Sequence, residues 1–331
     1  MNPDVDPRAA WSEYWRSGNR TTFLDGAYND RYDGELAQFW EQVADDLPDT
    51  ARVADLGTGN GVVALAIAHH CLQSGKNVRV TGIDHAVIDP DRLFEPEEKV
   101  LIDQGTLEFQ GETRFEHLPF ADGELDAVVS CFGFEYGDIE QVVAEADRVL
   151  NQHGLLAAVI HHADSEVVRR AQRSAEAIDF ALHQARLPLM AGRMLDLTGT
   201  IRDPARLRGD REAEKRRQAL NSALAAALAR GRELGDEAVV EQMCQQVMMV
   251  FGPARNEPLE SRRAHLRHVL ESQRAFAERM NQLARAARSD DELAAIESLF
   301  RQRGFNVQPS RRIMSTATPP EVMGVTLVAK R

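Results

Sequence analysis

The chain has 331 residues, of which 43% are hydrophobic and 27% charged, and none of its apolar runs reaches the roughly eighteen residues that a membrane-spanning helix needs. The acidic start MNPDVDPRAAW lacks the features of a targeting peptide, and the three cysteines form no CxxC pair, so we expect a cytoplasmic protein without disulfides and without a metal. The net charge of −13 is concentrated in residues 1–162, which carry 11 Lys and Arg against 30 Asp and Glu, and such a surface disfavours a nucleic-acid partner.

The first 48 residues are rich in aromatic side chains and contain a predicted helix over roughly residues 34–47. All three tryptophans and three of the four tyrosines precede the first predicted strand. One interpretation is a helical lid that closes over a ligand and excludes water. The alternative is that these aromatic residues only pack helices together. The residues assigned to the lid are Trp11, Tyr14, Trp15, Tyr28 and Tyr32.

From about residue 50, short β-branched runs alternate with helical stretches, which is typical of a parallel sheet covered by helices. The predicted strands are 52–56, 77–84, 106–110, 125–131 and 155–161, and the predicted helices lie near 61–74, 87–103 and 138–151.

After His162 the sequence is helical in composition and period for about 140 residues. A last helix is predicted to begin with the capping box of Ser289 and Glu292 and to end at Gly304 in a left-handed conformation. Two further strands are predicted at 307–314 and 324–330. This order indicates a helical insertion, which we expect to cover a substrate, to form a homodimer contact, or both.

The strongest motif is VADLGTGNGVVALAIA at residues 53–68, a strand that runs into a glycine-rich turn and then a helix. Glycines let the backbone approach a ligand closely, and the start of the following helix offers free N–H groups to a carboxylate. The fingerprint of dinucleotide-binding turns is GxGxxG, but Val62 stands where its third glycine would be. A turn without any ligand is the remaining alternative. The predicted binding residues are Asp55, Gly57, Thr58, Gly59, Asn60 and Gly61.

The second predicted strand ends at Asp84, followed by His85. One carboxylate at this place can accept hydrogen bonds from both hydroxyls of a ribose. An aspartate at a strand end is otherwise often a helix cap or a solvated residue.

These residues, together with RFEHLPFADGELD at 114–126, resemble the class I S-adenosylmethionine-dependent methyltransferases of the LPF-motif, small-molecule type. The similarity covers residues 50–162 and 304–331. It implies a Rossmann-like α/β fold with a seven-stranded, mostly parallel sheet, an antiparallel last strand and a large helical insertion between strands 5 and 6. The implied domains are the lid 1–48, the cofactor-binding core 49–162 with 304–331, and the insertion 163–303.

The resemblance also implies S-adenosyl-L-methionine as cofactor and S-adenosyl-L-homocysteine as product. Arg114 stands where family members carry an acidic or amide residue near the adenine amine, so Phe115 or His117 is expected there instead. Glu116 and Cys131 complete the expected cofactor residues.

The resemblance to the LPF-motif group implies a small, ring-containing acceptor. The stretch SCFGFEYGD, which begins at the end of the fourth strand, lacks the motifs of DNA amino- and cytosine-methylating enzymes. Alternatives are a non-catalytic module that binds the cofactor, and an RNA or protein methyltransferase. If the acceptor arrives protonated, the candidates for a general base are His161, His162, Glu135 and Tyr136. The two histidines could instead cap the next helix, and Glu135 and Tyr136 could shape the pocket.

Overall fold

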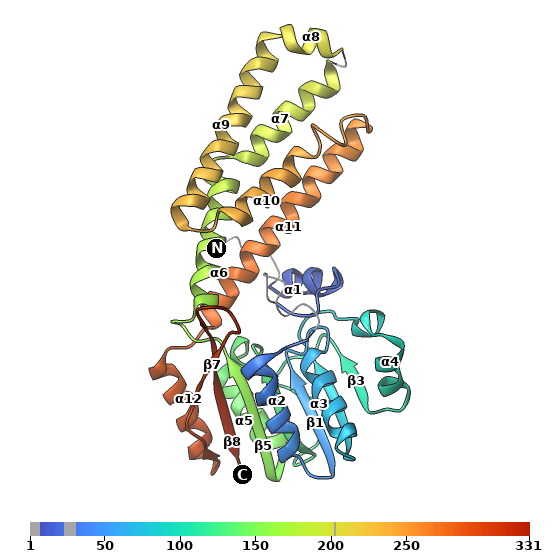
Figure 1. The fold of residues 1–331 in the computed structure, drawn as a ribbon, viewed down its shortest axis with the longest axis vertical. Helices are drawn as coiled ribbons and strands as arrows, with labels where there is room; N and C mark the ends of the chain where they lie inside the picture. The colour runs from blue at the N-terminus through green and yellow to red at the C-terminus, as the bar shows by residue number, and fades with distance from the viewer. Residues whose placement is uncertain (1–6, 23–30, 202) are drawn as a thin grey trace. The chain divides into compact units, whose positions relative to one another are not determined.

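The computed structural model describes residues 7–22, 31–201 and 203–331 (Figure 1). The chain divides into two compact units. The first comprises residues 1–169 and 282–331, and the second comprises residues 170–281. Tyr28, one of the residues assigned to the lid, lies outside the described residues.

The first unit is built on one eight-stranded sheet, in which seven strands have the order β3-β2-β1-β4-β5-β8-β6 and the eighth, β7, also pairs with β8. Strands β1 to β5 are parallel, and β8 runs antiparallel to β5. The mostly parallel sheet with an antiparallel last strand confirms the predicted fold class. The strand bounds are β1 Thr50–Leu56, β2 Asn77–Ile83, β3 Leu107–Gln110, β4 Leu125–Cys131, β5 Leu150–Ile160, β6 Asn306–Val307, β7 Arg312–Met314 and β8 Val322–Lys330.

The expected count of seven strands was wrong by one. The segment 307–314 was predicted as one strand, but β6 and β7 are two short strands that both pair with β8. Pro309 lies between them and has no N–H group to donate to the ladder, so a continuous strand is interrupted there.

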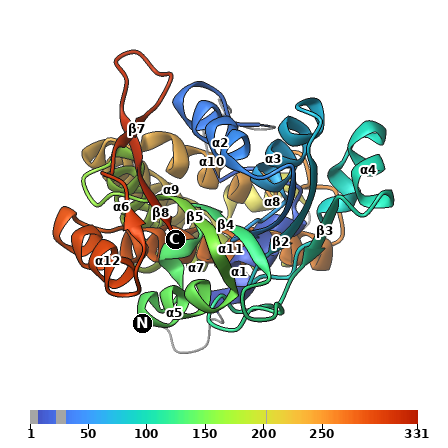
Figure 2. The ribbon, with the colours of Figure 1, turned by 90° about the horizontal axis from the view of Figure 1, so that it is seen from below.

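Helices cover both faces of this sheet, as Figure 2 shows for α2 and α3 on one side and α5 and α12 on the other. The alternation of side chains along β1 explains the two layers. Ala51 and Val53 belong to the core with α2 and α3, whereas Ala54 and Leu56 belong to the core with α5 and α12. The helices of this unit are α1 Pro7–Arg16, α2 Gly34–Asp46, α3 Val62–Gln73, η1 Pro90–Leu93, α4 Pro96–Asp103, η2 Phe134–Tyr136, α5 Ile139–Val149 and α12 Asp290–Gln302.

The predicted start and end of α12 are confirmed. Ser289 Oγ accepts a hydrogen bond from Glu292 N at 3.4 Å, and the Glu292 carboxylate accepts one from Ser289 N at 2.8 Å. Gly304 has φ +86°. The helix predicted over 87–103 is broken into η1 and α4, because Pro96 offers no N–H for a hydrogen bond to the preceding turn and therefore begins a new helix.

The second unit is helical and has its own apolar core, which includes Ile178, Leu195, Met243 and Val247. Leu189, Met248 and Met249 are exposed, and a homodimer through this unit stays a prediction. None of the helices in the described ranges combines the length and the apolar character needed to cross a membrane. The remaining bounds are α6 Glu166–Asp179, η3 Phe180–Gln184, α7 Leu187–Thr200, α8 Pro204–Gly209, α9 Arg211–Leu234, α10 Glu237–Met248 and α11 Leu259–Ala286.

Candidate functional site

The glycine-rich turn follows β1 at the carboxyl edge of the parallel strands. Gly57, Gly59 and Gly61 have φ values of +72°, +53° and +84°, in the left-handed region that favours glycine. A Cβ atom on Gly57 would lie only 2.7 Å from the Cα of Gly133, after β4. The turn is therefore held in a shape that other residues adopt only with strain, and it passes very close to the loop after β4.

Asp55 is buried below this turn, with 1% of its surface exposed. Its Oδ2 accepts hydrogen bonds from Thr58 Oγ1 at 2.8 Å and from Ala64 N at 3.2 Å. Burial raises the pKa of Asp55 to about 7 despite these two hydrogen bonds, and the nearby Asp84 carboxylate adds to the rise. The site therefore holds a carboxylate that a bound cation would stabilise in its charged form.

Asp84 directly follows β2 and faces the same turn. Its Oδ2 accepts from Gly59 N at 2.9 Å, and its Oδ1 accepts from Ala86 N at 2.8 Å. Burial raises the pKa of Asp84 to about 6, although the backbone N–H groups, that of His85 included, favour the charged form. Asp84 thus ties the end of β2 to the turn.

A cavity of about 380 Å³ lies between these elements, and all of its lining residues belong to the first unit. Its volume falls in the range of small-molecule sites, roughly 300 to 1,000 Å³. The structure brings to it twelve of the predicted residues: Trp11, Trp15, Tyr32, Asp55, Gly57, Thr58, Asp84, His85, Phe115, Glu116, Cys131 and Tyr136.

The other predicted residues do not line the cavity but most of them support it. Asn60 donates from Nδ2 to the backbone oxygens of Trp15 at 3.0 Å and Asn19 at 2.5 Å, so it fastens the end of α1 to the turn. Tyr14 donates to the backbone oxygen of Thr21 at 2.7 Å. The remaining predicted residues outside the lining are Gly59, Gly61, Glu135, His161 and His162.

The aromatic residues of α1 form one side of the cavity. The ring of Trp15 lies over Gly59, so close that a Cβ atom on this glycine would be 2.6 Å from it. Trp11 stacks on Trp15 with ring centroids 6.0 Å apart and meets Tyr136 edge to face at 5.7 Å. These contacts place the N-terminal helix over the glycine-rich turn, and its action as a lid stays a prediction.

Three of the four candidate bases are buried. Glu135 Oε1 accepts from His161 N at 2.9 Å and lies 2.7 Å from His161 Nδ1. His162 Nδ1 accepts from Asp164 N at 3.2 Å, and its Nε2 lies 3.0 Å from Asp290 Oδ1. Both ring nitrogens of His162 are thus engaged within the protein, whereas the start of α6 is capped by Ser165, whose Oγ accepts from Val168 N at 3.3 Å.

Tyr136 is the candidate base that lines the cavity. Burial and the neighbouring Glu135 raise the pKa of its hydroxyl well above its ordinary value. Phe132, whose backbone has φ +57°, also lines the cavity. The centroid of its ring lies 4.3 Å from that of the His161 ring. The pair formed by Glu135 and His161 therefore lies behind an aromatic wall.

The LPF segment leads from β3 toward β4 along one side of the cavity. Arg148 of α5 donates to the backbone oxygens of Leu118 at 3.3 Å and Phe120 at 2.8 Å, and to Asp122 at 2.9 Å. Arg148 thus holds the LPF segment against α5. At its start, Arg114 Nε donates to Glu116 Oε2 at 3.2 Å.

Several lining residues were not predicted from the sequence. Phe132 and Gly133 lie in the quoted SCFGFEYGD stretch, so their position after β4 was an available signal. Gln282 accepts a hydrogen bond from Trp11 Nε1 at 2.7 Å, but no sequence signal joins residues 271 positions apart. Ser130 was also missed: its hydroxyl donates to Leu56 O and accepts from Phe134 N, both at 2.7 Å, and so joins β1 to the loop after β4.

The raised pKa values of Asp55 and Asp84 predict a specific dependence of stability on pH. Between the unfolded value near 3.8 and the folded values of about 7 and 6, the folded protein binds more protons than the unfolded chain. The free energy of unfolding of the ligand-free protein should therefore fall as pH rises from 5 to 7, by up to roughly 1.4 kcal/mol per pH unit for one such group. Urea denaturation at several pH values measures this.

In the same experiment, the free energy of unfolding of Asp55→Asn should fall less between pH 5 and 7, because the amide does not titrate. Asp103→Asn, at an exposed position of α4, serves as control and should keep the decline of the unsubstituted protein. Equal slopes for the unsubstituted protein and Asp55→Asn would show that Asp55 is not the titrating group.

Comparisons with known proteins agree with this geometry. A family model described as a methyltransferase domain matches residues 54–158. No protein with a curated function matches the sequence.

Three solved structures illustrate the similarity. YcgJ from Bacillus subtilis is 26% identical, with 42% of this chain and 58% of that one covered and a TM-score of 0.32. A structure of the Haloferax volcanii Trm112 methyltransferase activator in complex with a methyltransferase is matched with 24% identity, coverages of 38% and 54%, and a TM-score of 0.29. Geranyl diphosphate C-methyltransferase from Streptomyces coelicolor A3(2) is 14% identical, with coverages of 48% and 65% and a TM-score of 0.35.

In each case the match spans less than two thirds of the length of the relative. The glycine-rich turn, Asp55 and Asp84 all fall inside the segment that the family model matches, and they surround one cavity. Residues 54–158 therefore match the methyltransferase-domain family.

Proposed function

We propose that this protein transfers a methyl group from S-adenosylmethionine to a small, ring-containing molecule. The observation that carries the proposal is the pair of buried carboxylates, Asp55 and Asp84, beside a glycine-rich turn. Neither has an ion-pair partner among the residues that the structure describes. Buried charges without partners are costly, so the pair favours a ligand that brings a cation and several hydroxyl donors.

The residues around the cavity fit this cofactor. Asp55 is suited to the ammonium group of the methionine moiety, and the start of α3 to its carboxylate. The two oxygens of Asp84 each accept one backbone hydrogen bond and keep a further lone pair for a ribose hydroxyl. Phe115 and Ala86, which both line the cavity, are suited to a flat adenine ring.

When bound, S-adenosylmethionine supplies a methyl group already activated by a positively charged sulfur. The chain itself then has to align the acceptor and keep water out. Trp11, Trp15, Phe132 and Tyr136 supply an aromatic wall for this purpose, and ring faces also attract a cation. Gln282 holds the indole of Trp11 in position.

Of the candidate bases, Tyr136 is the one that lines the cavity, but burial and Glu135 raise the pKa of its hydroxyl, so it stays protonated and is suited to donate a hydrogen bond rather than to receive a proton. Glu135 lies 2.7 Å from His161 Nδ1, behind Phe132. We propose that Tyr136 contacts the acceptor and that Glu135 and His161 are positioning residues for this wall. A cofactor-binding module without catalysis remains the second candidate, and no contact in the site favours it.

The proposal is tested by incubating the protein with S-adenosylmethionine and a pool of small metabolites while S-adenosylhomocysteine is measured by mass spectrometry. We expect the product to accumulate only when the pool is present. The same assay with RNA and with protein extract distinguishes the other acceptor classes, and the acidic front half predicts no product with RNA. Tight cofactor binding with no product from any acceptor would support the non-catalytic module instead.

A further inference from the structure

Residues 7–22, here called the strap, are fastened at their start to two loops of the core. Ser12 Oγ accepts a hydrogen bond from Val87 N at 3.0 Å, and Arg8 Nη1 lies 3.2 Å from Glu112 Oε1. Val87 and Glu112 lie in the loops that follow β2 and β3. Both loops also contribute residues to the lining of the 380 Å³ cavity, here called the cofactor cavity.

The end of α1 within the strap is held by two side chains of the core. Asn60 of the glycine-rich turn donates to the backbone oxygens of Trp15 at 3.0 Å and Asn19 at 2.5 Å. Arg92 of η1 donates to the backbone oxygen of Trp15 at 3.2 Å and to that of Arg16. Because the last carbonyl groups of a helix have no partner inside the helix, Asn60 and Arg92 act as its cap.

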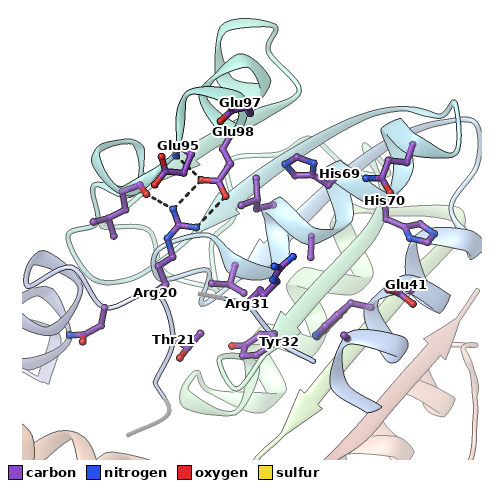
Figure 3. Close-up of a pocket in the computed structure, with 18 of the residues that line it drawn as sticks. Arg20, Thr21, Arg31, Tyr32, Glu41, His69, His70, Glu95, Glu97 and Glu98 are labelled. Carbon is purple, nitrogen blue, oxygen red and sulfur yellow. Dashed lines mark hydrogen bonds and ion pairs between the residues drawn. The ribbon is translucent and has the colours of Figure 1, made fainter. Parts of the chain in front are cut away.

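An ion pair holds the part of the strap that follows α1. Arg20 donates to Glu98 of α4, at 3.2 Å to Oε1 and 3.0 Å to Oε2, and to the backbone oxygen of Leu93 (Figure 3). Its guanidinium also lies over the ring of Phe94, 5.7 Å from the ring centroid. The side chains of Arg20 and Glu98 are only 14% and 18% exposed, so water and salt screen this pair less than a surface ion pair.

The strap brings two aromatic rings to the cofactor cavity. Trp11 and Trp15 both line it, and the ring of Trp15 lies over Gly59. The N–H of Gly59 is in turn bonded to Asp84, the proposed ribose ligand. A cofactor held by the turn and Asp84 therefore lies against the ring of Trp15.

The strap is nevertheless weakly anchored by apolar contacts. Among residues 8–22, only Ala10 and Trp15 are buried apolar residues, and none of these residues belongs to any of the three apolar cores. The pair of Arg8 and Glu112 is 39% and 61% exposed and contributes little. Segments with few buried apolar contacts open locally at a low free energy, so polar contacts decide how firmly the strap is held.

We propose that the strap is a lid over the cofactor, that Asn60, Arg92 and Glu98 hold it shut, and that cofactor and product exchange only when these contacts open. The inference rests on the proposed function. Trp15 then contacts the cofactor, whereas the three side chains that hold the strap are positioning residues. Arg92 and Glu98 do not line the cofactor cavity, so they act on the cofactor through the strap.

The rates of cofactor exchange test this lid. Radiolabelled S-adenosylmethionine bound to the full chain is chased with unlabelled cofactor, and rapid filtration measures its dissociation. Arg92→Ala combined with Glu98→Gln should release the label about tenfold faster, because charged hydrogen bonds to the strap are lost. The association rate should stay equal or rise, since an open lid does not obstruct entry. An unchanged dissociation rate, or a slower association that accounts for the whole change in affinity, would overturn the proposal.

A double variant of the same helix is the matched control. Glu97 and Lys99 are exposed residues of α4 on either side of Glu98, and neither lines the cofactor cavity. Glu97→Gln combined with Lys99→Ala changes one acidic and one basic residue, as the test variant does. Both of its exchange rates should equal those of the unsubstituted protein.

Hydrogen exchange followed by mass spectrometry measures the opening of the strap itself. S-adenosylhomocysteine should slow amide exchange in residues 7–22 about tenfold, and the Arg92 and Glu98 double variant should speed it in the same residues. Peptides from α12, which does not line the cofactor cavity, serve as the internal reference. Exchange in residues 7–22 that is indifferent to the product would contradict a lid.

The contact between the ring and the cofactor has its own test. Trp15→Ala should weaken the binding of S-adenosylhomocysteine about tenfold, and Trp15→Phe should keep most of the affinity because it retains a ring face. Equal affinities of Trp15→Ala and the unsubstituted protein would exclude this contact. If the unsubstituted protein binds neither S-adenosylmethionine nor its product, the proposed function fails, whereas normal binding with unaltered exchange rates in the double variant contradicts the lid alone.

Discussion

Replacement of Asp84 by alanine is expected to weaken the binding of S-adenosylhomocysteine by about 10- to 100-fold. The loss has two sources: the carboxylate no longer accepts from the ribose hydroxyls, and Gly59 N and Ala86 N lose their acceptor. Hydrogen bonds to a charged group each contribute roughly 1.5 to 3 kcal/mol. Isothermal titration calorimetry with the purified protein measures the change.

Two further variants separate these sources. Asp84→Asn keeps an acceptor for one backbone N–H but removes the charge. Its affinity for S-adenosylhomocysteine should lie between those of the unsubstituted protein and Asp84→Ala. Asp103→Asn removes an exposed carboxylate of α4 that does not line the cavity and should bind normally. If Asp84→Ala binds the product as the unsubstituted protein does, the ribose site does not include this residue.

Replacement of Gly59 by valine is expected to have the larger effect and to abolish measurable cofactor binding. The residue has φ +53°, which a β-branched side chain adopts only with strain. Its Cβ atom would also lie 2.6 Å from the ring of Trp15, so α1 would have to move away from the turn. A loss of more than about 100-fold in calorimetry, with reduced thermal stability, is the expected result.

The chain offers a matched control for the backbone strain. Gly75 has φ +76°, and a Cβ atom added to it would meet nothing within 4 Å. Gly75→Val should therefore lose stability from the strained backbone alone and keep its cofactor affinity. The contact with Trp15 predicts that adding Trp15→Ala to Gly59→Val restores part of the stability. If Gly59→Val binds normally, the turn does not surround the cofactor.

Local sequence patterns were sufficient to predict the five parallel strands, but not the division of 307–314 into β6 and β7. The strand 125–131 was placed to the residue, because β-branched runs bounded by turns have a clear signature. The capping box of Ser289 and the left-handed Gly304 were also predicted, since each depends on residues three or fewer positions apart or on one backbone angle.

The same reasoning could not find contacts between distant parts of the chain. Trp11 meets Gln282, and the backbone oxygen of Glu135 accepts from Arg288 at 2.8 Å across 153 positions. Nor could it show that His162 is engaged by Asp164 and Asp290 while Tyr136 reaches the cavity. Such outcomes depend on the packing of several elements at once, which no local pattern encodes.

The sequence by itself determined the glycine-rich turn, the acid at the end of β2 and the parallel sheet, because periodicity and the conformational freedom of glycine are local properties. Only the tertiary structure decided that the ring of Trp15 covers Gly59 and that Asn60 and Arg92 hold the end of α1. These features arise where side chains from separate elements meet, and their burial and hydrogen bonds exist only in the folded chain.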